Sequence, residues 1–306
     1  MRTRILPILL VAACAQAEDV VFRHAPVDLA RVREVVPLGN LNPPGHTFPT
    51  DHVYFYLDDH RRPADVVAPS AGEVVRVHTF EPGDAKIVVR VTGTVSWYVG
   101  HVTPAEGIEE GRRVEAGESL GTTSGRSYAL DLGVVDREVR RSGFVRPDRY
   151  PEDTVHCASP FPYFEPALRA RILALVQREG PDKEGRIDFD VPGRLAGNWF
   201  LDAGPDSWSK HLAFVYDVHD PTAIRISIGG TIGPAGAHAV APGSPDPKEV
   251  DARTGAVVYR LLDAHGERRE HGRLRVEMLG EERIRVEVFE SGDASAFGDG
   301  AREYVR

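Results

Sequence analysis

Short runs of apolar residues dominate the chain, and their spacing predicts β-strands rather than long helices. In the first half, residues 51–57, 72–78, 85–91, 94–102 and 128–135 are rich in β-branched and aromatic residues and are bounded by Gly, Pro or Asp. The second half repeats this pattern at 194–201, 210–217, 223–228, 256–262, 273–278 and 283–289. We therefore expect a mainly β protein with two strand-rich regions.

Two segments lack the strand pattern. Residues 165–178 carry apolar side chains at helical spacing, and Gly180-Pro181 ends this predicted helix. Residues 229–246 are dense in Gly, Pro and Ala and predict a loop. We expect an antiparallel β-sheet domain over 38–145, a linker with a helix over 146–186, and a β-sandwich or small β-barrel over 187–306.

The N-terminus has the layout of an export signal. Two arginines precede an apolar run over residues 5–13, and small residues follow it. This run is too short to span a bilayer. Two processing routes remain open, namely cleavage after Ala17 and lipidation of Cys14 in a Val-Ala-Ala-Cys sequence. We expect residues 1–17 to be a signal peptide and the protein to lie in the periplasm or outer envelope, with membrane contact only through lipidation.

Charge and cysteine content narrow the function classes. The formal net charge is -9 and no dense Lys/Arg block occurs, which argues against nucleic-acid binding because phosphate contacts need a positive surface. Cys14 lies in the predicted signal, so Cys157 would be the single cysteine of the mature chain. The sequence therefore offers neither an intramolecular disulfide nor a cysteine-rich zinc motif.

Polar residues in the first β region fall into five short motifs. In order, they are Gly45-His46-Thr-Phe-Pro-Thr-Asp51-His52, Ala68-Pro69-Ser-Ala-Gly72-Glu-Val74, Tyr98-Val-Gly-His101, Val114-Glu-Ala-Gly117-Glu-Ser-Leu120-Gly121 and Ala129-Leu-Asp131-Leu-Gly133. In order and spacing, this series resembles the lysostaphin-type (LytM-like) peptidoglycan metalloendopeptidases over roughly residues 46–136, about a third of the chain.

The resemblance implies a zinc site. In that family a His, an Asp and a later His hold zinc, whose bound water attacks a peptide bond, while two further histidines assist. Carried over residue by residue, His46 and Asp51 would be ligands, Asp131 would stand at the last ligand position, and His101 would be one of the two catalytic histidines.

The chain departs from the family at both ends of this set. Four residues separate His46 from Asp51 where the family has three, so His52 is an alternative ligand. Ala129 and Asp131 stand where the family has His-x-His, so one catalytic imidazole is missing. A set of one His and two Asp is harder and more anionic, and it should hold zinc less selectively.

Three functional hypotheses follow. The first is an exported envelope protein that binds peptidoglycan or regulates a wall hydrolase without being an enzyme. The second is an active zinc metalloendopeptidase with altered ligands. The third is a small-ligand-binding β-barrel protein, suggested by Gly193-Arg-Leu-Ala-Gly-Asn-Trp199, which resembles the first strand of lipocalin-like barrels. A buried Trp at the start of a β domain is the alternative interpretation of that segment.

Overall fold

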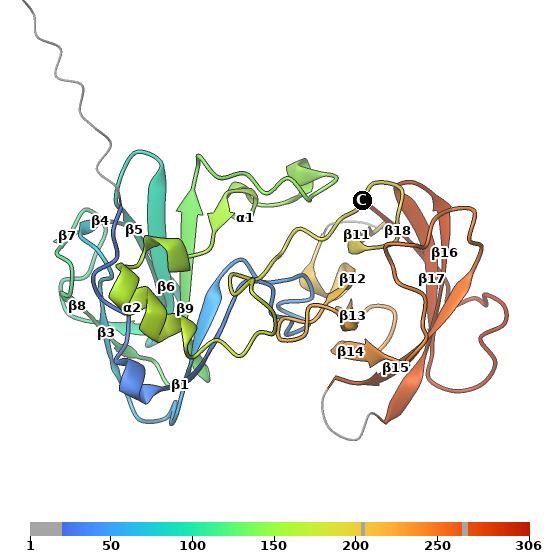
Figure 1. Ribbon diagram of the computed structural model, residues 1–306, viewed down its shortest axis with the longest axis horizontal. Coiled ribbons are helices and arrows are strands. Elements are labelled where there is room, and N and C mark those ends of the chain that lie inside the picture. The colour runs from blue at the N-terminus through green and yellow to red at the C-terminus, as the bar shows by residue number, and fades with distance from the viewer. Residues whose placement is uncertain (1–19, 203–205, 265–268) are drawn as a thin grey trace, which may run out of the picture.

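The computed structural model describes residues 20–202, 206–264 and 269–306, and their strands form two separate assemblies (Figure 1). The predicted signal peptide, with Cys14, lies outside these ranges. Within them, no helix is both long and apolar enough to cross a membrane. The prediction of a mainly β protein is confirmed.

The first assembly is a 10-stranded sheet, counted over the described residues. Its main path runs β1-β2-β9-β6-β5-β4-β7, while β10 pairs with β9, and β8 links β3 to β6. Every pairing between these strands is antiparallel. The strands are β1 (Val32–Val36), β2 (Val53–Leu57), β3 (Asp65–Val67), β4 (Gly72–Glu81), β5 (Asp84–Arg90), β6 (Val95–Pro104), β7 (Arg113–Val114), β8 (Ser119–Thr123), β9 (Ala129–Asp136) and β10 (Cys157–Ala158).

Alternation along the central strands gives this sheet one apolar and one polar face. Trp97 and Val99 of β6, with Leu130 and Leu132 of β9, are fully buried in the larger core. The residues between them, including Tyr98 and Asp131, point to the opposite face because successive strand side chains alternate. We call this second surface the open face, and the predicted site residues lie on it.

The second assembly is a closed barrel of eight strands, β11 to β18 in chain order. Side chains such as Trp199, Phe214 and Tyr259 are fully buried in its core, so the interior is packed. The barrel strands are β11 (Gly197–Leu201), β12 (His211–Tyr216), β13 (Ile224–Ile228), β14 (Gly236–Val240), β15 (Val257–Asp263), β16 (Glu270–Gly280), β17 (Arg283–Phe289) and β18 (Arg302–Val305).

The prediction of a loop over residues 229–246 is partly wrong, because β14 lies within this segment. Strand β14 pairs with β13 on one side and with β15 on the other. These backbone ladders belong to the closed barrel, and the strand depends on its pairing partners rather than on local residue preference.

Short helices lie between β9 and the barrel, on either side of β10. They are α1 (Glu152–Val155) and α2 (Pro166–Leu173), with the 3-10 turns η2 (Pro147–Arg149) and η3 (Phe161–Tyr163); η1 (Leu29–Arg31) and η4 (Trp208–Lys210) lie elsewhere. Helix α2 ends before residue 178, where the predicted helix ended. The reason is that the Leu175 carbonyl accepts a hydrogen bond from the Val35 amide of β1, which draws the chain out of the helix.

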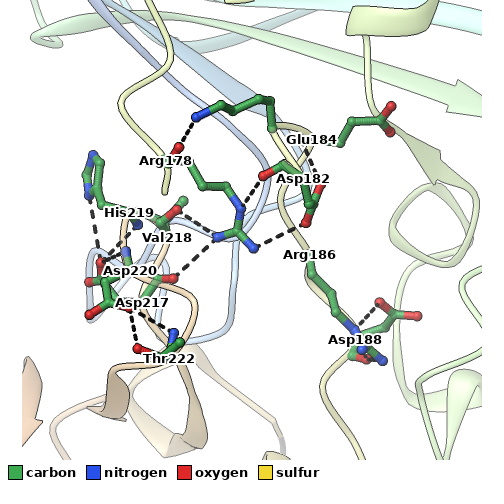
Figure 2. Close-up of polar contacts among 11 residues, drawn as sticks. Arg178, Asp182, Glu184, Arg186, Asp188, Asp217, Val218, His219, Asp220 and Thr222 are labelled. Atoms are coloured by element: carbon green, nitrogen blue, oxygen red, sulfur yellow. Dashed lines mark hydrogen bonds and ion pairs between the residues drawn. The ribbon is translucent and has the colours of Figure 1, made fainter. Parts of the chain in front are cut away.

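A buried arginine joins the connecting segment to the barrel. Figure 2 shows the Arg178 guanidinium between the Asp182 segment and the turn after β12. It donates to the carbonyl oxygens of Asp182 at 3.0 Å and of Val218 at 2.8 Å. The His219 ring, in the same turn, pairs with Glu34 of β1 at 2.8 Å. These contacts hold the β12–β13 turn, residues 217–223, against the first sheet.

Candidate functional site

Three predicted residues converge on the open face, one just before β2 and the others within β6 and β9. Asp131 on β9 lies opposite Tyr54 of β2 and opposite Gly100 of β6. His52 directly precedes β2, and His101 follows Gly100. The register of the two ladders therefore brings His52 and His101 to either side of Asp131.

Asp51 orients His52 rather than facing the centre of this group. The Nδ1 of His52 donates to Asp51 Oδ1 at 3.1 Å, and the Thr154 hydroxyl donates to Asp51 Oδ2 at 2.6 Å. Burial alone would raise the pKa of Asp51, but the hydrogen bonds from His52 and Thr154 hold that pKa well below its usual value. Asp51 is therefore ionised, and it fixes the ring of His52 with Nε2 directed at Asp131.

Asp84 orients the ring of His101 in the same way as Asp51 orients His52. The sequence analysis did not single out Asp84. Asp84 is buried at the start of β5, and the Nδ1 of His101 donates to its Oδ2 at 3.0 Å. His101 has a φ of 64°, a left-handed conformation that is uncommon for a residue other than glycine. The available sequence signal was an Asp directly after the turn residues Pro82-Gly83. Its partner, His101, lies 17 residues further along the chain.

Two Asp–His pairs thus point their free nitrogens at one carboxylate. Nε2 of His52 and Nε2 of His101 each lie 3.6 Å from Oδ2 of Asp131. Burial opposes protonation of His52, but Asp131 and Asp51 raise its pKa overall. Nε2 of His52 and Oδ1 of Asp131 are buried without a hydrogen-bond partner.

His46 lies at the edge of this group. Its backbone forms a small hairpin with Asn42, and its ring centroid is 5.3 Å from that of His52. Burial lowers the pKa of His46, with the nearby His52 adding to the effect, so its neutral form is favoured. A neutral imidazole is the form that ligates metals.

The potential metal ligands lie close together, but they do not form a ready-made metal site. Among the described residues, no group of three or more His, Cys, Asp or Glu is arranged to hold a metal ion. Asp51 is hydrogen-bonded to His52 and Thr154, whereas the resemblance implies that it is a ligand beside His46. The donors left over for zinc are His46, His52 and Asp131, with the unpartnered His52 Nε2 and Asp131 Oδ1 among their atoms.

The position of the missing imidazole is buried and apolar. Ala129 is 3% exposed, and it packs in a small apolar cluster with Val36, Tyr54 and Val218. Val218 belongs to the β12–β13 turn that Arg178 holds in place. The position where the resemblance calls for a catalytic histidine is thus part of the contact between the two assemblies.

Tyr98 and Lys86 border the site. The sequence analysis placed Tyr98 in a motif without giving it a role, and it did not single out Lys86. The Tyr98 hydroxyl donates to Asp51 Oδ1 at 3.3 Å, and Nζ of Lys86 lies 3.4 Å from the Tyr98 ring centroid. Gly133 makes this possible, because a Cβ there would come within 2.1 Å of Tyr98 Cζ. Lys86 and Tyr98 lie on neighbouring strands and meet on this surface. A motif read along the chain does not show such a contact.

Comparisons with known proteins give partial structural likenesses only. No family model matches the chain, and no curated protein is similar to it. Csd3 of Helicobacter pylori is 15% identical over 47% of this chain and 35% of that chain, with a TM-score of 0.33. A zinc-containing peptidase from Vibrio cholerae is 20% identical over 38% of this chain and 37% of that chain, with a TM-score of 0.32.

A third solved structure, LytU, is 17% identical over 44% of this chain and 83% of that chain, with a TM-score of 0.31. The chain spans only about a third of the length of the Csd3 and Vibrio cholerae structures. Because these likenesses are partial and weak, the assignment of the site depends on the geometry described above.

Proposed function

We propose that the chain is an exported envelope protein whose open face binds the peptide part of peptidoglycan without hydrolysing it. The two Asp–His pairs and Tyr98 offer hydrogen-bond donors and acceptors to a peptide backbone. The signal-like N-terminus supports export, and the ordered motifs of the first half support a wall ligand.

The apolar environment of Ala129 carries this proposal. A metallopeptidase of the resembled type needs a second imidazole there to act on the water or the developing oxyanion. Here Ala129 places a methyl group in a buried apolar cluster that also holds Val36, Tyr54 and Val218. A histidine at this position would place a larger, polar ring in that apolar cluster, so the packing as well as the sequence disfavours the catalytic set.

Binding to isolated sacculi tests the proposal directly. We expect the purified mature protein to sediment with sacculi, to do so equally with a chelator present, and to release no new soluble muropeptides. The substitution His52→Ala should weaken sedimentation, because it removes a ring from the centre of the open face. Failure to sediment, with the protein folded by circular dichroism, would overturn the proposal.

One observation favours an active zinc peptidase as the second candidate. His52 Nε2 and Asp131 Oδ1 are buried and unpartnered, which is costly unless a bound group satisfies them. If they fit zinc, His46, His52 and Asp131 would hold it and His101 would orient a water. About one zinc per chain, lost together with crosslink cleavage in both His46→Ala and Asp131→Ala, would establish this candidate.

Regulation of a separate wall hydrolase is the remaining form of the first hypothesis. It predicts that the protein changes the rate of a hydrolase in the same assay while itself binding sacculi weakly. The small-ligand alternative gains no support from the barrel, whose interior is filled by its own aromatic and aliphatic side chains.

A further inference from the structure

A groove of about 670 Å³ runs along the open face beside the site. Its floor is formed by alternate residues of β5, β6 and β9, including Val88, Tyr98 and Val135. Tyr98 is shared with the site, since its hydroxyl bonds Asp51. A ligand on the Asp–His pairs would therefore continue into this groove without leaving the sheet.

The walls of the groove are cationic, although the chain as a whole carries a net charge of -9. Among its lining residues, four are Arg or Lys and one is a carboxylate: Arg76, Lys86, Arg90 and Arg137 against Asp153. Arg90 is paired with Glu73 at 3.1 Å, and Arg137 is paired with Glu152. These two arginines are already neutralised.

Arg76 and Lys86 differ from these two arginines. Within the described part of the chain, neither side chain has a carboxylate at ion-pair distance. They lie on the neighbouring strands β4 and β5, and Lys86 is half-buried against the Tyr98 ring. Burial lowers the pKa of Lys86, against the opposing effects of Asp51, Asp153 and Asp131, so its charge is only partly compensated where it stands. An anion between the two cations would offset the lost solvation of Lys86.

The opposite wall carries the complementary charge. Asp153 of α1 is exposed and lines the same groove, next to Thr154, which bonds Asp51. The groove thus offers two cations on one side, a carboxylate on the other and an apolar floor between them. This arrangement suits a chain that bears a carboxylate, an aliphatic segment and an amino group, rather than a bare anion.

We propose that this groove binds an acidic peptide, whose free carboxylate lies between Arg76 and Lys86. The proposal rests on the proposed function, and it specifies the ligand as a wall stem peptide with unamidated carboxyl groups. Peptides in which those carboxyl groups are amides would lose the charge that the two cations recognise.

The experiment compares two synthetic stem peptides that differ only in amidation, using calorimetric titration of the purified mature chain. We expect the acidic peptide to bind at least about ten-fold more tightly than the amidated one, since ten-fold corresponds to about 1.4 kcal/mol. Arg76→Gln and Lys86→Gln should each abolish this preference. Arg171→Gln removes the same charge from the exposed side of α2, outside the groove lining, and should retain it.

Each outcome is decisive. Equal binding of the two peptides, or an unchanged preference in both groove variants, overturns the inference even if sacculi are bound. A preference that depends on Arg76 and Lys86, together with no binding to sacculi, upholds the groove and overturns the proposed function instead. Displacement of the acidic peptide by inorganic phosphate at equal concentration would show a general anion site and would also overturn the inference.

Discussion

At the scale of single residues, carboxylates decide which way the histidines face. Asp51 and Asp84 each accept from an Nδ1, which leaves the Nε2 atoms of His52 and His101 free to meet at Asp131. The motif spacing located four of these five residues. It could not assign Asp51 to an orienting role, because that role depends on Thr154 and Tyr98 from other elements.

Gly133 allows Tyr98 to lie flat across β9, which predicts a cost for any side chain there. Because a Cβ would stand 2.1 Å from Tyr98 Cζ, Gly133→Ala must displace the ring. We expect a loss of about 1–3 kcal/mol in the free energy of unfolding, the usual range for overpacking. Chemical denaturation measures it, and Gly280→Ala, where a Cβ meets nothing within 4 Å, is the control. An unchanged midpoint would mean that the ring has another position available.

Cys157 should be inert in the folded protein. It is 1% exposed on β10, and burial raises its pKa to about 12. Only the thiolate reacts with disulfide reagents, so almost none is present near pH 8. In a Cys14→Ser chain, we expect no reaction with Ellman's reagent until denaturant is added, and then one thiol per chain. Rapid labelling of the native chain would show that β10 opens readily.

At the scale of elements, the local pattern predicted strands well and their partners poorly. The alternating runs at β5, β6 and β17 were found because each has a buried face. Strand β14 was missed because Gly and Ala carry little pattern, and its existence depends on ladders to β13 and β15. Strand β10 and the early end of α2 were missed for the same reason, since both depend on backbone contacts with distant strands.

The Arg178 contacts predict that one side chain stabilises the β12–β13 turn. Arg178 is 6% exposed, and its donors satisfy the carbonyl oxygens of Asp182 and Val218. Arg178→Met would leave these buried acceptors unpaired, at a cost of about 2–4 kcal/mol in unfolding free energy. Thermal or urea unfolding measures the change, and Arg171→Met, on the exposed side of α2, should cost little. Equal effects in the two variants would contradict the role given to Arg178.

At the scale of the whole molecule, the barrel completes the surroundings of the site. Val218 belongs to the same apolar cluster as Ala129, and the Phe48 ring, two residues after His46, stacks on His211 of β12 with centroids 4.0 Å apart. A linear sequence gives no sign of such contacts, because they join residues more than 80 positions apart. They bring the second half into contact with the surroundings of the site.

The Phe48–His211 stack predicts how acid affects this contact. Burial lowers the pKa of His211 below its ordinary value of 6.5, against the opposing effect of Asp206. A group whose folded pKa is depressed gives its full stabilisation above its unfolded pKa of about 6.5, and that contribution falls as the pH drops through the folded value. The wild-type chain should therefore lose more stability than His211→Gln between about pH 7.5 and pH 5.5. Urea midpoints at the two pH values measure both losses, and other titrating groups cancel in the comparison. Equal losses would mean that protonated His211 is accommodated at the contact, and that the two assemblies are not coupled through this ring.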